Sequence, residues 1–309
     1  MHDYPVTVSD ARSWHLAGLA RLAGVSACLR DVLGLRRYGP AVRITSMTNQ
    51  KGGVGKTGLT AGVGGALAER GRRVLLVDLD PQGHLSAEAL GLDDQPASGP
   101  SLAGALAGTY EGPTVDLAVE HSRTPAGGHI DVLANSLAMF TVGRALDQLP
   151  AREWRLARLL DVLDGVYDHC LIDSPPALDI LTDNALAACH GVVIPVQLER
   201  TSIRALRLLT GQISGLENVL RRDRIEIHGL VPSLYRRPLH RLADSVMHQL
   251  ESLPLPIVAH LPLGVAVPEA WASGQTVTDY APGCEHAAQY RRIADVLDEA
   301  AGLAVKEAP

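Results

Sequence analysis

The segment from Asn49 to Thr57, with the sequence NQKGGVGKT, constrains the fold of this chain more than any other feature. It follows the apolar run Val42–Met47 directly and opens the helical pattern Thr57–Arg70. A glycine-rich turn between a buried strand and a helix directs backbone N–H groups and the helix N-terminus toward one point, which suits a phosphate group. We therefore expect a phosphate-binding strand–loop–helix unit.

The rest of the 309-residue chain continues the alternation of strand and helix. The apolar runs suited to buried strands are Val42–Met47, Val74–Leu79, Ile130–Leu133, Cys170–Ile172, Val192–Val196, Ile225–Val231 and Ile257–Leu261. The helical patterns are Thr57–Arg70, Glu153–Leu163, Ile203–Leu220, Leu239–Leu250 and His286–Ala301. This order predicts an α/β fold, namely a doubly wound, mostly parallel sheet with helices on both faces and a ligand crevice at the carboxyl ends of the strands. The stretch Leu92–Gly128, rich in Gly, Pro, Ser and Asp, is expected to be an irregular surface excursion.

We expect residues 1–40 to be a separate leader and residues 41–309 to form one main domain. In the leader, Leu19–Ser26 and the following Cys28–Gly34 have the spacing of a helix-turn-helix, with Gly24 at the turn. About forty residues barely bury a core of their own. We therefore interpret the leader as an amphipathic helical extension that packs on the main domain or on a partner, with a helix-turn-helix remnant as the alternative.

Composition narrows the functional classes. The net charge of −6 does not suit a protein that binds nucleic acid by its bulk charge, so any contact with DNA needs a local basic patch. The four cysteines, Cys28, Cys170, Cys189 and Cys284, form no CxxC pair, which indicates neither a disulfide framework nor a metal knuckle and favours a cytoplasmic location. The run from Leu16 to Leu29 is short and contains Arg21, so we expect no signal peptide and no association with a membrane.

The residues of the phosphate loop suit ATP and Mg²⁺. The expected nucleotide-binding residues are Lys51, Gly52, Gly53, Val54, Gly55, Lys56, Thr57 and Gly58. Glycines allow the backbone to approach the phosphates closely, Lys56 can reach the β- and γ-phosphates, and the Thr57 hydroxyl can bind Mg²⁺. Of the 28 basic residues only Lys51, Lys56 and Lys306 are lysine, and two of these lie in the loop, where a compact ammonium fits better than a forked guanidinium.

Three aspartates follow strands that should end beside this loop. Asp78 and Asp80 close the second apolar run and point to the same side if the strand stays extended. Asp173 closes another run, just before Ser-Pro-Pro. The expected Mg²⁺ ligands are Thr57, Asp78 and Asp173, with carboxylates supporting Mg²⁺-bound water.

Four segments together, residues 49–57, 72–83, 168–186 and 191–199, resemble the ParA/Soj partition ATPases, in the wider deviant Walker A group that includes MinD. Gln50 stands at the first glycine position of an ordinary Walker A loop, and Lys51 follows it. The resemblance implies that residues 41–309 form a P-loop ATPase domain. It implies an ATP-dependent DNA segregation ATPase that forms an ATP-sandwich homodimer, binds DNA non-specifically on the nucleoid, and is reset by hydrolysis with a ParB-type partner.

The resemblance also implies roles for individual residues. Lys51, Lys56 and Asp80 would be catalytic, with Lys51 reaching the partner's nucleotide and Asp80 supporting the activation of water. Ser233 and Pro262 match positions near the adenine. Gly58 and His84 depart from the family pattern, which usually has a hydroxyl residue and an asparagine there.

The surface that would bind DNA is less defined. Many relatives carry arginines where this chain has Leu263 and Ala266. Two other clusters could replace them, although arginines at helix ends are ordinarily solvated or stabilise the helix. The candidates are Arg221, Arg222, Arg224, Arg236 and Arg237.

A MinD-like positioning ATPase, acting on a membrane or a protein cargo, is the main alternative. It needs a basic, apolar amphipathic tail, and Tyr290–Pro309 contains four acidic residues and neither Phe nor Trp. An iron–sulfur carrier of the same loop class needs suitably placed cysteines, which the four scattered cysteines do not provide. A tyrosine kinase of this class needs a terminal tyrosine cluster, and here only Tyr280 and Tyr290 lie near the end of the sequence. A plasmid, a chromosome and another cargo are all compatible with the partition function.

Overall fold

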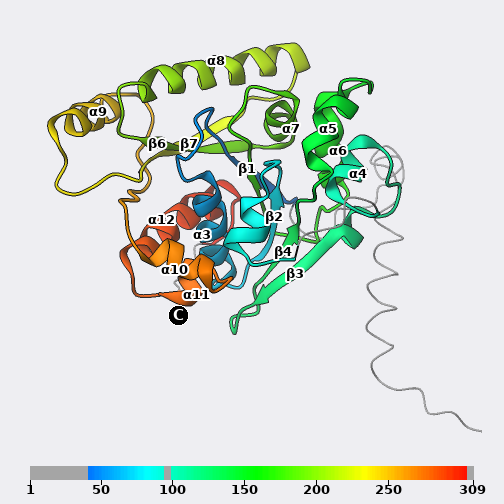
Figure 1. Cartoon of the computed structure of the whole chain (residues 1–309), viewed down its shortest axis with the longest axis horizontal. Coiled ribbons are helices and arrows are strands. Elements are labelled where there is room, and N and C mark those ends of the chain that lie inside the picture. Colours follow the sequence, from blue (N-terminus) through cyan, green and yellow to red (C-terminus); the bar gives the residue numbers. More distant parts are fainter. Residues whose placement is uncertain (1–40, 94–98, 305–309) are drawn as a thin grey trace, which may run out of the picture.

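The computed structural model describes residues 41–93 and 99–304, so the predictions for the leader lie outside the described residues. A seven-stranded sheet forms the centre, in the order β3-β4-β2-β5-β1-β6-β7 (Figure 1). Its strands are β1 (Arg43–Met47), β2 (Arg73–Asp78), β3 (Ala118–Arg123), β4 (His129–Leu133), β5 (His169–Asp173), β6 (Gly191–Gln197) and β7 (Glu226–Ser233). Only the β3–β4 pair is antiparallel. The predicted mostly parallel sheet is confirmed.

Helices cover both faces of the sheet because its strands are apolar on both sides. Leu75 and Val77 of β2 join the core on one face, whereas Val74 and Leu76 join the core on the other. The first face carries α4 (Leu102–Ala107), α5 (Met139–Leu146), α6 (Arg155–Asp161), α7 (Ile180–Ala188), α8 (Ser202–Leu220) and α9 (Arg241–Glu251). The second carries α3 (Lys56–Ala68), α10 (Ala266–Ala272), α11 (Val277–Tyr280) and α12 (Glu285–Ala300). Figure 1 shows α8 and α9 above the sheet and α3 and α12 below it.

Helix α3 is buried almost all round, and glycines permit this. A Cβ at Gly62 would lie 2.3 Å from Cε2 of Tyr290 on α12, and a Cβ at Gly65 would lie 2.4 Å from Oγ1 of Thr278 on α11. Glycine in a helix interior costs about 1 kcal/mol relative to alanine, and here it allows close helix packing. The helix that follows the phosphate loop is therefore fixed on several sides.

The C-terminal helix is anchored to the sheet by a buried carboxylate. Asp298 on α12 is fully buried, and its Oδ1 accepts a hydrogen bond of 2.9 Å from Nε of Arg72 and lies 3.0 Å from Nε2 of His169. Arg70 adds a longer contact of 3.5 Å. These partners precede or begin β2 and β5, so the anchor lies at the edge of the sheet opposite the phosphate loop.

The structure corrects two expectations about secondary structure. The stretch Leu92–Gly128 is not wholly irregular, because it contains α4, the 3₁₀ turn η2 (Thr114–Leu117) and β3. β3 is an edge strand with half-buried or exposed side chains, so it lacks an apolar run. Ile257–Leu261 is not a strand, since it forms only two single bridges to β7. Within it, the N–H of His260 donates to the side chain of Gln289 instead of to a strand.

Candidate nucleotide-binding site

The loop between β1 and α3 has the backbone conformation that its glycines permit. Gly53 and Gly55 have φ angles of 69° and 91°, in the left-handed region that favours glycine. No side chain caps the N-terminus of α3, and its first turn contains no acidic residue. The backbone N–H groups at the positive end of the helix therefore have no capping side chain and remain available for a phosphate group.

Residues of β6 and β7 hold this loop in shape. The side chain of Asn49 donates to the carbonyl of Pro195 at 2.7 Å, and that of Gln197 donates to the carbonyl of Gly53 at 2.8 Å. The hydroxyl of Ser233 donates to the carbonyl of Val54 at 2.7 Å. The resemblance placed Ser233 near the adenine. In the structure its hydroxyl is bonded to the backbone of the phosphate loop.

Lys56 places an ammonium group inside the loop. Its side chain is almost fully buried, and Nζ donates a single long hydrogen bond of 3.3 Å to the carbonyl of Lys51. Burial lowers the pKa of Lys56, while the nearby carboxylates of Asp173 and Asp80 act in the opposite direction. A buried cation with so little hydrogen bonding suits the terminal phosphates of a nucleotide.

Thr57 and Asp173 form the oxygen-rich side of the site. The Thr57 hydroxyl donates to Oδ2 of Asp173 at 2.7 Å, whereas Oδ1 of Asp173 is buried without a hydrogen-bond partner. Burial raises the pKa of Asp173 well above its usual range, and the neighbouring carboxylate of Asp78 adds to this. Hydroxyl and carboxylate oxygens are the ligands that Mg²⁺ prefers, so these residues fit the ion.

Asp78 lies beside Asp173 in the β2–β5 register. Its Oδ2 accepts hydrogen bonds from the backbone and the hydroxyl of Ser86, at 2.8 and 2.6 Å, and its Oδ1 is buried without a partner. Burial raises the pKa of Asp78 to about 6. Ser86 belongs to the π-helical turn η1 (His84–Ala89). Asp78 is thus bound to η1 through one carboxylate oxygen, and its other oxygen has no hydrogen-bond partner.

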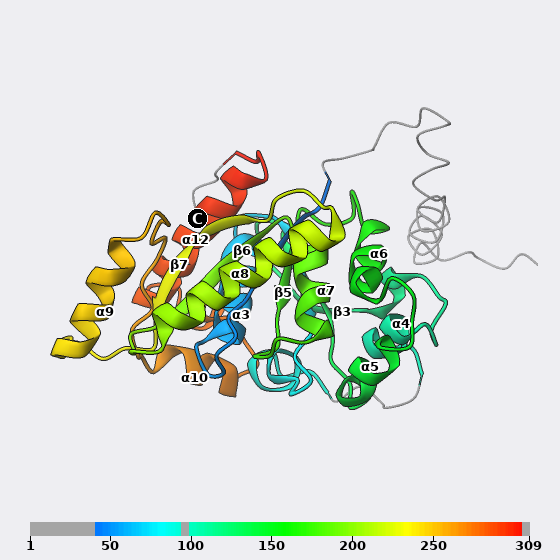
Figure 2. The ribbon, with the colours of Figure 1, turned by 90° about the horizontal axis from the view of Figure 1, so that it is seen from above.

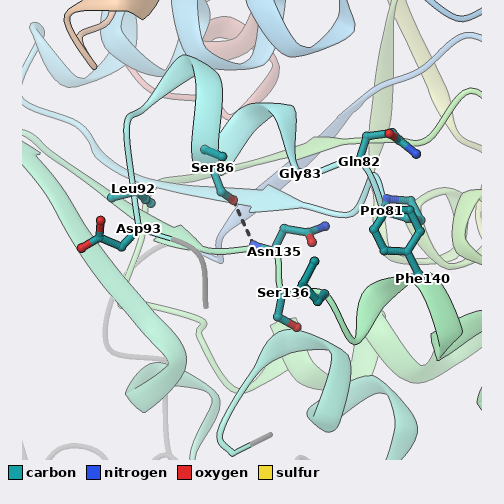
Figure 3. Close-up of a pocket in the computed structure, with 11 residues that line it drawn as sticks. Pro81, Gln82, Gly83, Ser86, Leu92, Asp93, Asn135, Ser136 and Phe140 are labelled. Carbon is teal, nitrogen blue, oxygen red and sulfur yellow. Dashed lines mark hydrogen bonds between the residues drawn. The ribbon is translucent and has the colours of Figure 1, made fainter. Parts of the chain in front are cut away.

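Asp80 lies just past the end of β2, where the chain turns, so the strand does not stay extended through both aspartates. Its carboxylate accepts from the N–H of Gln82 at 3.1 Å, and its backbone carbonyl accepts from the side chain of Asn135 at 2.6 Å. The N–H of Asn135 donates in turn to the Ser86 hydroxyl at 2.9 Å (Figure 3). Sequence patterns did not single out Ser86 or Asn135.

Lys51 is engaged within its own subunit. Its Nζ lies 2.6 Å from Oε2 of Glu199 and donates to Oε1 of Gln197, also at 2.6 Å. Both partners follow the buried part of β6. Neither had been assigned a role, although both lie in the segment 191–199 that carries the resemblance.

The predicted arginines do not form one patch. Arg222 donates to the carbonyls that end α7, including Cys189 O at 2.6 Å, which is a structural task. Arg221 and Arg224 are exposed near the start of β7, whereas Arg236 and Arg237 lie past its other end. The carbonyl of Pro262, the second proposed adenine contact, lies 2.8 Å from Nε2 of His286.

The strand–loop–helix geometry, the buried Lys56 and the Thr57–Asp173 pair define a P-loop nucleotide-binding protein. A family profile described as an AAA domain matches residues 42–227. The chain is 35% identical over 257 residues to the chromosome partitioning protein ParA of Caulobacter vibrioides, covering 82% of this chain and 92% of that protein. It is 35% identical over 270 residues to the chromosome-partitioning ATPase Soj of Thermus thermophilus, covering 82% and 94%. The chain belongs to the ParA/Soj family of ATPases.

Solved structures support the same fold. A protein from Mycobacterium smegmatis described as cobyrinic acid a,c-diamide synthase, with bound ADP and magnesium, has a TM-score of 0.67 and 31% identity, covering 82% of this chain and 93% of that chain. The septum site-determining protein MinD of Pyrococcus horikoshii, complexed with Mg-ADP, has a TM-score of 0.64 and 26% identity, covering 84% and 98%. Within residues 41–93 and 99–304, no helix is long and apolar enough to cross a bilayer.

Proposed function

We propose that this chain is an ATP-dependent DNA segregation ATPase, a switch that closes as an ATP-sandwich homodimer and is reset by hydrolysis. The observation that carries the proposal is the glycine loop that surrounds the buried Lys56 and lies beside the Thr57–Asp173 hydrogen bond. Relatives described as chromosome partitioning proteins, and neighbours with bound ADP and magnesium, support the reading. The proposed cofactors are ATP and Mg²⁺.

The residues of the loop and of the neighbouring strand ends have different roles in this proposal. Backbone N–H groups of residues 52–58 hold the phosphates, and Lys56 neutralises charge on the β- and γ-phosphates. Thr57 and Asp173, with the oxygen of Asp78 that has no hydrogen-bond partner, would hold Mg²⁺, which would supply further positive charge to the phosphate oxygens. Asp80 positions water at the carboxyl end of β2. Catalysis then rests on positioning and electrostatics.

Dimer closure would change the partner of Lys51. In the single subunit its ammonium is bound to Glu199 and Gln197. For Lys51 to reach the nucleotide of the partner subunit, it must leave both oxygen atoms. Closure therefore exchanges an ion pair within one subunit for a contact with phosphate across the interface.

The exposed arginines after β7 are the proposed DNA contact. Arg236 and Arg237 follow the strand end that also holds the phosphate loop, through Ser233. Because this surface is connected to the phosphate loop through β7, its affinity for DNA can depend on which nucleotide is bound. A ParB-type partner and a nucleoid location complete the proposed function.

The site assignment is tested by ATP binding and turnover in three variants, Lys56→Ala, Lys51→Gln and Asp80→Ala. We expect Lys56→Ala to lose ATP binding, and the other two to bind ATP but to lose turnover by about 10²-fold or more, as for a lost transition-state contact. Full ATPase activity in all three would reject the assignment.

The DNA surface needs its own measurement, namely DNA binding with ATP, with ADP and without nucleotide over a salt series. Binding should require ATP and weaken steeply with salt. Arg236→Ala combined with Arg237→Ala should weaken it, whereas the matched pair Arg221→Ala and Arg224→Ala should not. Equal losses in both pairs would contradict the choice of surface.

A MinD-like membrane helix receives less support at α12, because its apolar residues Ile293 and Leu297 are buried against the domain.

A further inference from the structure

A groove lies far from the nucleotide loop, between α8 and the beginning of β7. It encloses about 460 Å³, and its lining includes Ile213 of α8, Ile225 and Ile227 near the start of β7, and Leu255. Because β7 runs from Glu226 to Ser233, and Ser233 contacts the phosphate loop, the groove lies at the opposite edge of the sheet. Figures 1 and 2 show α8 crossing the sheet on the face away from α3.

Two carboxylates lie along this groove. Glu217 and Glu226 both belong to its lining, with Arg224 as the basic residue among them. The side chain of Glu226 is 57% exposed, although it already pairs with Arg43. An apolar floor with acidic residues at its border suits an amphipathic segment that carries basic residues.

The described chain begins beside the groove. Arg43, the first residue of β1, forms an ion pair of 2.8 Å with Glu226. Val42 packs in the same core cluster as Ile213 and Ile225, so this end of the chain lies on the face of the sheet that carries the groove. Whatever precedes residue 41 therefore starts next to it.

The sequence that precedes residue 41 has matching chemistry. Leu19, Leu22, Leu29 and Val32 recur at spacings that place apolar side chains along one side of a helix. Residues 1–40 contain five arginines against three aspartates, a charge opposite to that of Glu217 and Glu226. A helix over residues 16–33 would be about 27 Å long. Residues 34–41 could span up to about 26 Å, which is ample for a return to the groove.

We propose that the leader docks in cis, as an amphipathic helix, in the groove between α8 and β7. The leader would then be a built-in part of the domain at the edge remote from ATP. It would not be a free DNA-reading module. The inference is independent of the proposed ATPase function, since it uses neither the phosphate loop nor the dimer.

A native cysteine allows a direct test in the full chain. Cys28 lies in the leader, and Ser214 is an exposed groove residue on α8. In a Cys284→Ser background, with Cys170 and Cys189 buried, Ser214→Cys should form a cross-link to Cys28 within one chain on addition of a short bismaleimide. The matched control is Ser273→Cys, exposed next to α10 on the opposite face of the sheet.

We expect the cross-link at Ser214→Cys to form at several-fold higher yield than at Ser273→Cys, and Leu22→Glu to lower it toward the control. A cross-link between two chains would assign the groove to a second copy and overturn docking in cis. Equal yields at both positions, as a freely moving helix-turn-helix would give, would also overturn it, as would no cross-link at all.

Hydrogen exchange gives an independent readout. In the full chain, Leu22→Glu combined with Leu29→Glu should raise the exchange of backbone amides in residues 208–228 several-fold and leave residues 266–280 unchanged. Identical exchange in wild type and variant over residues 208–228 would contradict the proposal, even if the variant binds ATP normally.

Discussion

Lys51 shows how one side chain can serve two states of the protein. Its ammonium lies 2.6 Å from both Glu199 and Gln197 in the single subunit, although its proposed task lies on the partner's nucleotide. Partly exposed ion pairs contribute about 0.2–1 kcal/mol. The contact with Glu199 is therefore strong enough to bias dimer closure and weak enough to break on ATP binding.

Glu199→Gln should make dimerisation easier, because it removes the charge that holds Lys51 within its own subunit. We expect the ATP concentration at half-maximal dimerisation to fall about two- to fivefold, the range that a surface pair of this kind can supply. Light scattering across an ATP titration measures it. Glu120→Gln, which removes an exposed partner of Arg123 on β3, is the control and should leave the midpoint unchanged. A higher midpoint for Glu199→Gln would contradict the account.

Thr57→Val tests the Mg²⁺ side of the site, since it keeps the shape of the side chain and removes the hydroxyl that bonds Asp173. Affinity for ATP should fall about tenfold or more in the presence of Mg²⁺, because a ligand and a charge-assisted hydrogen bond are both lost. The loss should be much smaller in EDTA. Calorimetry measures both. Thr60→Val on the same helix, whose hydroxyl bonds only a helical carbonyl, should change neither affinity. Equal losses with and without Mg²⁺ would exclude the metal role.

At the scale of residues, the sequence predicted the groups of the site that act locally. Lys56 and Thr57 follow from the spacing in the loop, and Asp173 follows from its place at a strand end. The supports of these groups could not be predicted from spacing. Asn135 holds the turn at Asp80 from a position 55 residues away, and Gln197 contacts Gly53 from the neighbouring strand β6.

At the scale of elements, the buried strands were predictable and the partly exposed ones were not. β5 and β6 are apolar runs because helices cover both their faces. β3 pairs on one side only, and its sequence AVEHSR has no pattern that separates it from a loop. At Ile257–Leu261 the apolar run predicted a strand that does not form. This segment makes only single bridges to β7, and part of its backbone bonds to a side chain instead.

Helix α3 provides a stability prediction that opposes helix propensity. Gly62→Ala should lower the free energy of unfolding by about 1–3 kcal/mol, because the added methyl group would overlap the ring of Tyr290 and overpacking outweighs the gain in propensity. In Gly211→Ala on α8, no atom lies within 4 Å of the new Cβ, and stability should rise by about 0.5–1 kcal/mol. Urea denaturation measures both. A stabilised Gly62→Ala would show that α3 and α12 are not packed this closely.

At the scale of the whole molecule, Asp298 joins the last described helix to the sheet. Burial acts to raise the pKa of Asp298, but hydrogen bonds from His169 and Arg72 together outweigh it, so the pKa is lowered. Its contribution to stability is therefore full above the pKa of an unfolded aspartate, about 3.9, and is lost as the pH falls through the lower folded value.

Asp298→Asn should accordingly cost about 3–5 kcal/mol at neutral pH, because it leaves buried arginine charge unpaired. Stability measured by denaturation at several pH values should depend less on pH below about 4 in the variant than in wild type. Asp295→Asn removes a partly exposed partner of Arg70 and should cost about 1 kcal/mol or less. Similar losses for the two variants would mean that the buried cluster does not anchor α12.

The proposed switch depends on Lys51 acting across the dimer, which an ATPase assay on mixed subunits tests most directly. Lys51→Gln and Asp80→Ala, which both should keep ATP binding, should each be nearly inactive alone. In an equal mixture, the Lys51→Gln subunit keeps its own Asp80 and receives Lys51 from its partner. The mixture should therefore recover up to about a quarter of the wild-type rate, if the subunits pair at random in a two-fold dimer. A mixture as inactive as its components would show that Lys51 acts on its own nucleotide and would contradict the account.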